Sequence, residues 1–113
     1  MRRLDPDRFE ALVEKAYAEL PIDITSMLEN VVIQIDDDNA DGLLGLYEGI
    51  PLTERYDYGD LQLPDVVTIY RLPLCEMASD LAELEHEVRV TLIHELAHHL
   101  GIDDDRLHQL GWA

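Results

Sequence analysis

The feature that most constrains the fold is a long helical stretch that ends in the residues HELAH at 94–98. Ser79 or Asp80 is placed to cap its start, and Glu83 follows Asp80 by three residues as in a capping box. Gly101 is placed to end it. Apolar residues recur at helical spacing between these limits: Leu81, Leu84, Val88, Leu92, Leu96 and Leu100. The pattern predicts a helix of about twenty residues that buries one face and holds the other rigidly.

The two histidines of this helix have the spacing of metal ligands. His94 and His98 lie four residues apart, so they are neighbours on one helix face and can share one ion. Glu95 lies at the edge of the same face, where it can take a proton from water without being a ligand. The pattern HExxH is therefore typical of zinc hydrolases.

A tetrahedral zinc site needs a third protein ligand from another direction. A sharp turn at Gly101 can return Asp104 to the ion, so the string reads HExxHxxGxxD. Asp103 and Asp105 flank this position. His108 is the alternative third ligand if the turn places the next helix over the metal. His99 points about 100° away from His98 and cannot share the ion in an ideal helix.

The spacing of His94, Glu95, His98, Gly101 and Asp104 resembles the metzincin-type signature of zincin metallopeptidases. The stretches LYEGIPLTER and EVRVTLIHELAHHLGIDDDRLHQLGW resemble more closely a family of very small, functionally uncharacterised bacterial zincin-like proteins. This resemblance covers roughly residues 43 to 112. It implies a zincin-like α+β fold and a zinc site, but no known substrate.

Three departures separate the chain from larger zincins. The last methionine is Met77, upstream of the motif, so the chain lacks the methionine turn of metzincins. The residues beneath the metal must therefore differ from those of metzincins. No glutamate follows Glu95, which excludes the gluzincin subclass. Few residues follow Asp104, so we expect no C-terminal wall and an open, shallow site.

The remaining patterns predict a minimal zincin-like α+β fold as a single domain over residues 1–113, with a small mixed sheet of three or four strands on two long helices. Asp5 and Pro6 start the first long helix. The HExxH motif lies on the second. The predicted elements are a helix at 6–20, a helical turn at 21–29, strands at 31–35, 43–47 and 66–72, and the motif helix.

Two loops carry polar residues that are candidates for a functional site. The aspartates at 36–41 lack the alternating ligands and terminal glutamate of an EF-hand, so we interpret them as a solvated turn. By resemblance, residues 43–48 form the strand along the upper rim of a substrate cleft. Arg55, Tyr56 and Tyr58 in the loop that follows are candidate donors to a substrate oxyanion.

The composition limits the partners. The formal net charge is −17, which repels nucleic acid and anionic membranes and favours basic peptides. The apolar runs are too short to cross a bilayer, and the N-terminus lacks a signal segment. One cysteine, Cys75, agrees with a reducing compartment. We therefore expect a cytoplasmic protein with a peptide or protein substrate.

The sequence thus predicts a zinc-dependent metallopeptidase in which His94, His98 and Asp104 bind Zn²⁺ and Glu95 is the general base. Two alternatives stay open. One is a non-enzymatic zincin-like binding module with a structural metal or none. The other is a zinc-dependent endoribonuclease, against which the net charge and Glu95 both argue, because that family has glycine after its first histidine.

Overall fold

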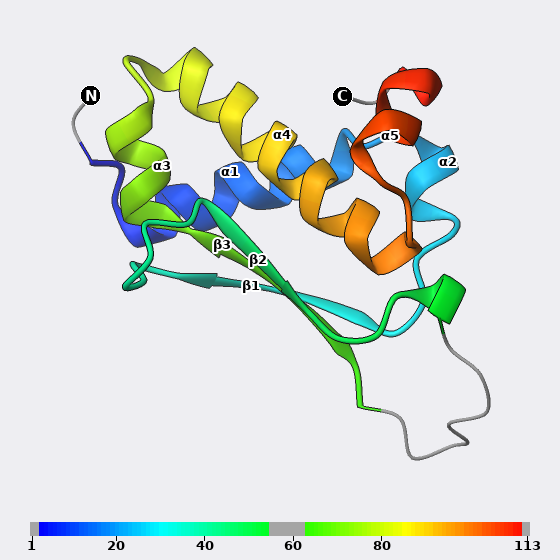
Figure 1. Cartoon of the computed structure of the whole chain (residues 1–113). Helices are drawn as coiled ribbons and strands as arrows, with labels where there is room; N and C mark the ends of the chain where they lie inside the picture. Colours follow the sequence, from blue (N-terminus) through cyan, green and yellow to red (C-terminus); the bar gives the residue numbers. More distant parts are fainter. Residues whose placement is uncertain (1–2, 55–62, 112–113) are drawn as a thin grey trace.

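The computed structural model describes residues 3–54 and 63–111 and shows a three-stranded mixed sheet (Figure 1). The strands β1 (Val31–Asp36), β2 (Gly45–Glu48) and β3 (Asp65–Tyr70) lie in the order β1-β3-β2. β1 runs parallel to β3, and β2 runs antiparallel to it. β3 is therefore the central strand, and Val67 and Ile69 on it are completely buried.

Two long helices cover one face of this sheet (Figure 1): α1 (Pro6–Ala18) and α4 (Leu81–Leu100). The side chain of Asp5 accepts a hydrogen bond from the backbone of Arg8, and Pro6 occupies the first turn, where its missing N–H costs nothing. The fully buried side chains of the core include Phe9 on α1, Leu84, Val88, Leu92 and Leu96 on α4, and Val67 and Ile69 on β3. The predicted α+β fold is confirmed.

α4 begins and ends as its sequence predicts. Asp80 accepts from the backbone N–H of Glu83, while the Ser79 hydroxyl donates to the Glu83 carboxylate. Gly101 ends the helix in the left-handed conformation with φ of 75°. A Cβ there would also overlap the Thr53 side chain, so no other residue fits without rearrangement. One predicted core residue was wrong, because Leu81 in the first turn is 49% exposed.

The predicted strand at 66–72 extends too far. The strand ends at Tyr70, and Arg71 begins a helix, α3 (Arg71–Met77), that the sequence analysis missed. The Arg71 guanidinium donates to Asp37 at 3.0 Å and to the Leu4 carbonyl at 2.9 Å, contacts with distant segments that hold the chain at this corner. Pro73 falls in the first turn of α3, where no backbone donor is lost from the helix.

The remaining elements are short. The first helix ends at Ala18 rather than at residue 20, and the predicted helical turn at 21–29 contains only α2 (Ile22–Thr25). A 3-10 turn, η1 (Leu52–Glu54), follows β2, and α5 (Asp104–Leu110) follows α4. None of the helices in the described parts of the chain combines the length and apolarity needed to span a bilayer.

The acidic segment at 36–41 is a hydrogen-bonded turn organised by an asparagine. The Asn39 carbonyl oxygen accepts from the backbone of Asp41 and of Leu43, and its amide donates to the Leu43 carbonyl. No group of possible metal ligands occurs in this segment within the described ranges. The interpretation of a solvated turn agrees with this geometry.

Candidate metal centre

The last two turns of α4 bring His94, Glu95 and His98 together. Each offers one possible ligand atom, and these atoms lie within 4.8 Å of one another. The two imidazole rings have centroids 4.9 Å apart. Nδ1 of His98 lies 3.4 Å from the Glu95 carboxylate. In the described part of the chain this is the one cluster of His, Cys, Asp and Glu side chains with ligand spacing.

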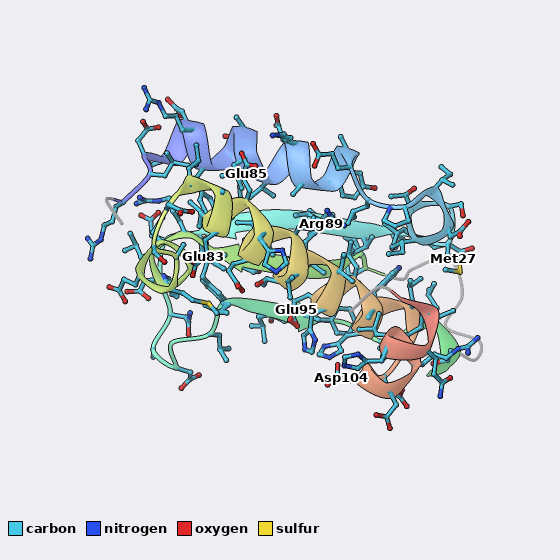
Figure 2. The ribbon with its side chains drawn as sticks, turned by 90° about the horizontal axis from the view of Figure 1, so that it is seen from above. Met27, Glu83, Glu85, Arg89, Glu95 and Asp104 are labelled. Atoms are coloured by element: carbon cyan, nitrogen blue, oxygen red, sulfur yellow. The ribbon has the colours of Figure 1, made fainter. Side chains whose placement is uncertain are left out.

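Glu95 is the buried member of this cluster. It is 6% exposed, whereas His94 is half-buried and His98 is exposed. Gly45 on β2 makes this burial possible, because a Cβ there would lie 2.7 Å from Cγ2 of Thr91 and 3.1 Å from Cγ of Glu95. The missing side chain lets β2 approach α4 at this turn. Figure 2 shows Glu95 beside β2.

Burial has an electrostatic consequence for this carboxyl. Removal from water disfavours the charged form and raises the pKa of Glu95 above its ordinary value. The neighbouring His98 and His94 act in the opposite direction when they are charged. Since burial is the larger cause, Glu95 holds its proton more tightly than a solvated glutamate.

Asp104 is placed beside His94 by the turn at Gly101. It is the first residue of α5, its side chain is 72% exposed, and its Oδ1 lies 3.4 Å from Nδ1 of His94 (Figure 2). Two ligands about 2.0–2.1 Å from a tetrahedral zinc ion are about 3.3 Å apart, so this spacing suits a shared ion. Asp104 is not within ligand spacing of the whole His94–Glu95–His98 cluster.

The neighbours of Asp104 have other positions. Asp103 caps α5 by accepting from the backbone of Arg106 at 2.8 Å, and Asp105 is exposed in the first turn of the helix. His108 is exposed near the end of α5 and joins no ligand cluster of the described residues. Of these residues, Asp104 is the one with a described contact to a cluster histidine, 3.4 Å from His94.

Two cavities flank His98. A groove of about 550 Å³ lies between β2 and α4, and it is lined by Leu43–Tyr47 and by Glu87, Val90, Thr91, His94, Glu95 and His98. A second cavity of about 400 Å³ lies toward the Gly101 turn and is lined by Tyr47, Pro51, His98, Gly101, Ile102, Asp103 and Asp104. The segment expected at the rim thus borders the cluster. Arg55, Tyr56 and Tyr58 lie outside the described residues.

A buried hydrogen-bond network behind His98 was missed by the sequence analysis. His99 is fully buried, and its Nε2 accepts from the backbone N–H of Glu29 at 3.2 Å. The ring proton is therefore on Nδ1, which donates to Oδ2 of Asp65 at 2.8 Å. The Tyr47 hydroxyl donates to the same oxygen at 2.6 Å. The network joins α4 to β2 and β3 directly behind the cluster.

Residues 19–112 match the zincin-like metallopeptidase family. The chain belongs to this family. A solved structure that is similar to this zincin-like chain is a conserved hypothetical protein from T. thermophilus, with 28% identity, coverage of 86% of this chain and 94% of that chain, and a TM-score of 0.58. No curated protein matches the chain significantly.

Membership of the zincin-like family implies a divalent metal, typically zinc, and the residues present fit one. Two imidazoles and nearby carboxylates are the nitrogen and oxygen donors that zinc prefers. Their spacing on α4 allows them to approach one ion from the same side. His94, Glu95 and His98, which all line the groove, could therefore bind a metal ion.

We expect Glu95→Gln to stabilise the metal-free protein at pH 7.5. The pKa of Glu95 is raised in the folded state, so between the ordinary value of 4.5 and the raised value the folded state binds a proton that the unfolded chain has released. Stability is therefore lost as pH rises through this window, and glutamine avoids the loss. Urea midpoints of both proteins in EDTA measure it: they should nearly coincide at pH 4 and separate at pH 7.5.

Glu87→Gln is the matched control, because Glu87 lies on the same helix and lines the same groove without joining the cluster. Its midpoint should follow that of the unsubstituted protein at both pH values. A difference for Glu95→Gln that does not change with pH would contradict the burial of an ionising carboxyl.

Proposed function

We propose that the chain is a zinc-dependent peptidase in which His94, His98 and Asp104 bind the metal and Glu95 is the general base. The observation that carries this proposal is the position of Glu95. Its side chain is buried within ligand spacing of both histidines, yet it lines a groove bordered by an edge strand. A structural metal site needs no buried carboxylate that opens onto a groove.

Each residue has a distinct task in this proposal. Bound zinc would supply Lewis-acid activation of water and of the peptide carbonyl. His94 and His98 would hold it as neutral imidazoles, and Asp104 would approach from the turn after Gly101. Glu95 would accept the proton of the attacking water and return it to the leaving amine. A pKa raised by burial brings this carboxyl closer to the working pH, as efficient proton transfer requires.

The groove suggests the form of the substrate. β2 is the edge strand next to α4, so an extended peptide can lie along it and pair with its backbone. Leu43 and Val90 give the groove apolar walls, and Glu87 adds a negative charge. Together with the net charge of −17, this favours short or unfolded basic peptides over nucleic acid or folded proteins.

The test is a cleavage screen with untagged protein loaded with zinc. Unfolded basic peptides should be cleaved, the activity should disappear on chelation, and it should return when zinc is added back. Mass spectrometry of the products identifies the cleaved bonds. A zinc-loaded protein that cleaves no peptide above the background of the chelated protein would favour the alternative of a non-enzymatic binding module.

We expect Asp104→Ala to weaken zinc binding roughly 10- to 100-fold, because a tetrahedral site loses one of three protein ligands. Asp105→Ala is the matched control and should leave the affinity unchanged, since its side chain is one residue farther along the exposed first turn of α5. Asp103→Ala is a poorer control because it removes the α5 cap. Competition with a chromogenic chelator measures the affinities; equal losses for Asp104→Ala and Asp105→Ala would contradict the ligand assignment.

A further inference from the structure

A second groove lies at the opposite edge of the sheet from the metal centre. It is a cavity of about 670 Å³ between α1 and β1, and we call it the α1–β1 groove. α1 packs mainly against α4, and Figure 2 shows its blue ribbon running alongside the cyan ribbon of β1. Val13 and Tyr17 contribute from the helix, and Val31, Ile33 and Ile35 from the strand. The helix therefore flanks the place that a further strand beside β1 would occupy.

β1 is an edge strand without the usual protection. It pairs with β3 on one side and with no other strand of the described residues. Its sequence VVIQID contains no proline and no lysine, the residues that commonly block edge pairing. Val31, Ile33 and Ile35 face the helix layer and stay only half-buried. Both the backbone and this apolar row are thus available to a further strand.

The helix wall of the α1–β1 groove is acidic. Glu10 and Glu14 lie one turn apart on α1, both are exposed, and neither forms a salt bridge with a described residue. Arg71 is the one basic side chain in the lining, and its charge is already paired with Asp37 at 3.0 Å. The groove therefore offers uncompensated negative charge beside an apolar strand edge.

We propose that the α1–β1 groove binds an extended basic segment of a partner protein, which adds a fourth strand beside β1. Side chains of a strand alternate between its two faces, so the row that faces α1 would place lysine or arginine near Glu10 and Glu14, and the apolar row would lie on the other face, beside the exposed Val32 of β1. A second copy of this chain fits poorly, because each copy carries a net charge of −17. The proposal concerns the edge remote from β2 and does not depend on peptidase activity.

The test uses the full ¹⁵N-labelled chain carrying Glu95→Gln, so that the probe is not cleaved. The probe is a twelve-residue peptide that alternates lysine with valine, and its control has glutamate in place of each lysine. The lysine peptide should bind and shift the backbone amide signals of β1 and the exposed side of α1. The glutamate peptide should not bind. Two further lysine peptides carry N-methyl groups on every second residue, one on the odd-numbered residues and the other on the even-numbered residues. Pairing through one strand edge uses every second backbone N–H, so one of these peptides should bind and the other should not.

Charge reversal locates the site. Glu10→Lys with Glu14→Lys should weaken binding of the lysine peptide at least ~10-fold, because both charges that face the probe are reversed. Asp23→Lys with Asp105→Lys makes the same change in net charge on exposed residues outside this groove and should change binding less than about twofold. Circular dichroism checks that each variant is folded.

Three results would overturn the proposal. The first is the absence of binding at millimolar peptide. The second is binding whose shifts map to β2 and α4 and that is unaffected by the reversal at Glu10 and Glu14. The third is a concentration-dependent dimer in sedimentation velocity that is abolished by Val32→Lys, since Val32 is exposed on β1 and such a dimer would identify a second copy as the occupant.

Discussion

Glu95→Gln in the zinc-loaded protein should lower peptide hydrolysis at least ~100-fold while zinc stays bound. Loss of a general base typically costs about 10²- to 10⁴-fold, because proton transfer from the attacking water then has no positioned acceptor. Glutamine preserves the shape of the side chain in the tight space beside Gly45 and Thr91. Initial rates on a peptide identified in the screen measure the effect, and metal analysis of the same sample shows that zinc is retained.

Glu87→Gln again provides the matched control, because it removes a carboxylate that lines the same groove but does not belong to the histidine cluster. It should leave the maximal rate nearly unchanged and alter at most the affinity for basic peptides. Equal rates of hydrolysis for Glu95→Gln and the unsubstituted protein would show that Glu95 is not the general base. Loss of zinc from Glu95→Gln would instead make Glu95 a ligand, as its place in the histidine cluster would also allow.

Asp65→Ala should lower the free energy of unfolding by about 3 kcal/mol, since each buried donor that loses its acceptor costs roughly 1–3 kcal/mol. Oδ2 of Asp65 accepts from the Tyr47 hydroxyl and from the fully buried His99 ring, and Oδ1 accepts from the backbone of Ile50. The side chain of Asp65 is 4% exposed, so water cannot readily replace these bonds. Urea unfolding of the metal-free protein measures the change.

Two further variants make this prediction specific. Asp65→Asn should lower the free energy of unfolding less than Asp65→Ala does. Its carbonyl oxygen can turn toward Tyr47 and His99, so of the three bonds described here the one from Ile50 is lost. Asp36→Ala removes an exposed carboxylate at the end of β1 and should stay within about 0.5 kcal/mol of the unsubstituted protein. Similar losses for Asp65→Ala and Asp36→Ala would show that the network contributes little to stability.

Features encoded by short sequence intervals were predictable. The α4 helix with its caps at Asp80 and Gly101, and the shared face of His94 and His98, follow from the helical period and from residues a few positions apart. The family resemblance drawn from the same segment is confirmed. The assignment of His94, His98 and Asp104 as ligands stays a prediction, and so does the role of Arg55, Tyr56 and Tyr58.

Features that depend on contacts between distant segments were not predictable. The predicted strand at 66–72 was too long because Arg71 is held at the corner by Asp37 and by the Leu4 carbonyl, and nothing in its local pattern shows those partners. His99 was recognised only as a residue unable to share the ion. Its acceptor Asp65 lies far away in sequence and reaches it only through the pairing of β3 with its neighbours.

The sequence by itself determined which residues carry the chemistry, because the helix that aligns the histidines is built from local hydrogen bonds and a local apolar stripe. Only the tertiary structure decided the environment of those residues. The close approach of Gly45 buries Glu95, and the separation of α1 from β1 leaves a second groove at the other edge of the sheet. Burial and charge environment are sums over neighbours from distant segments, so they exist only once the strand order β1-β3-β2 and the helix layer have formed.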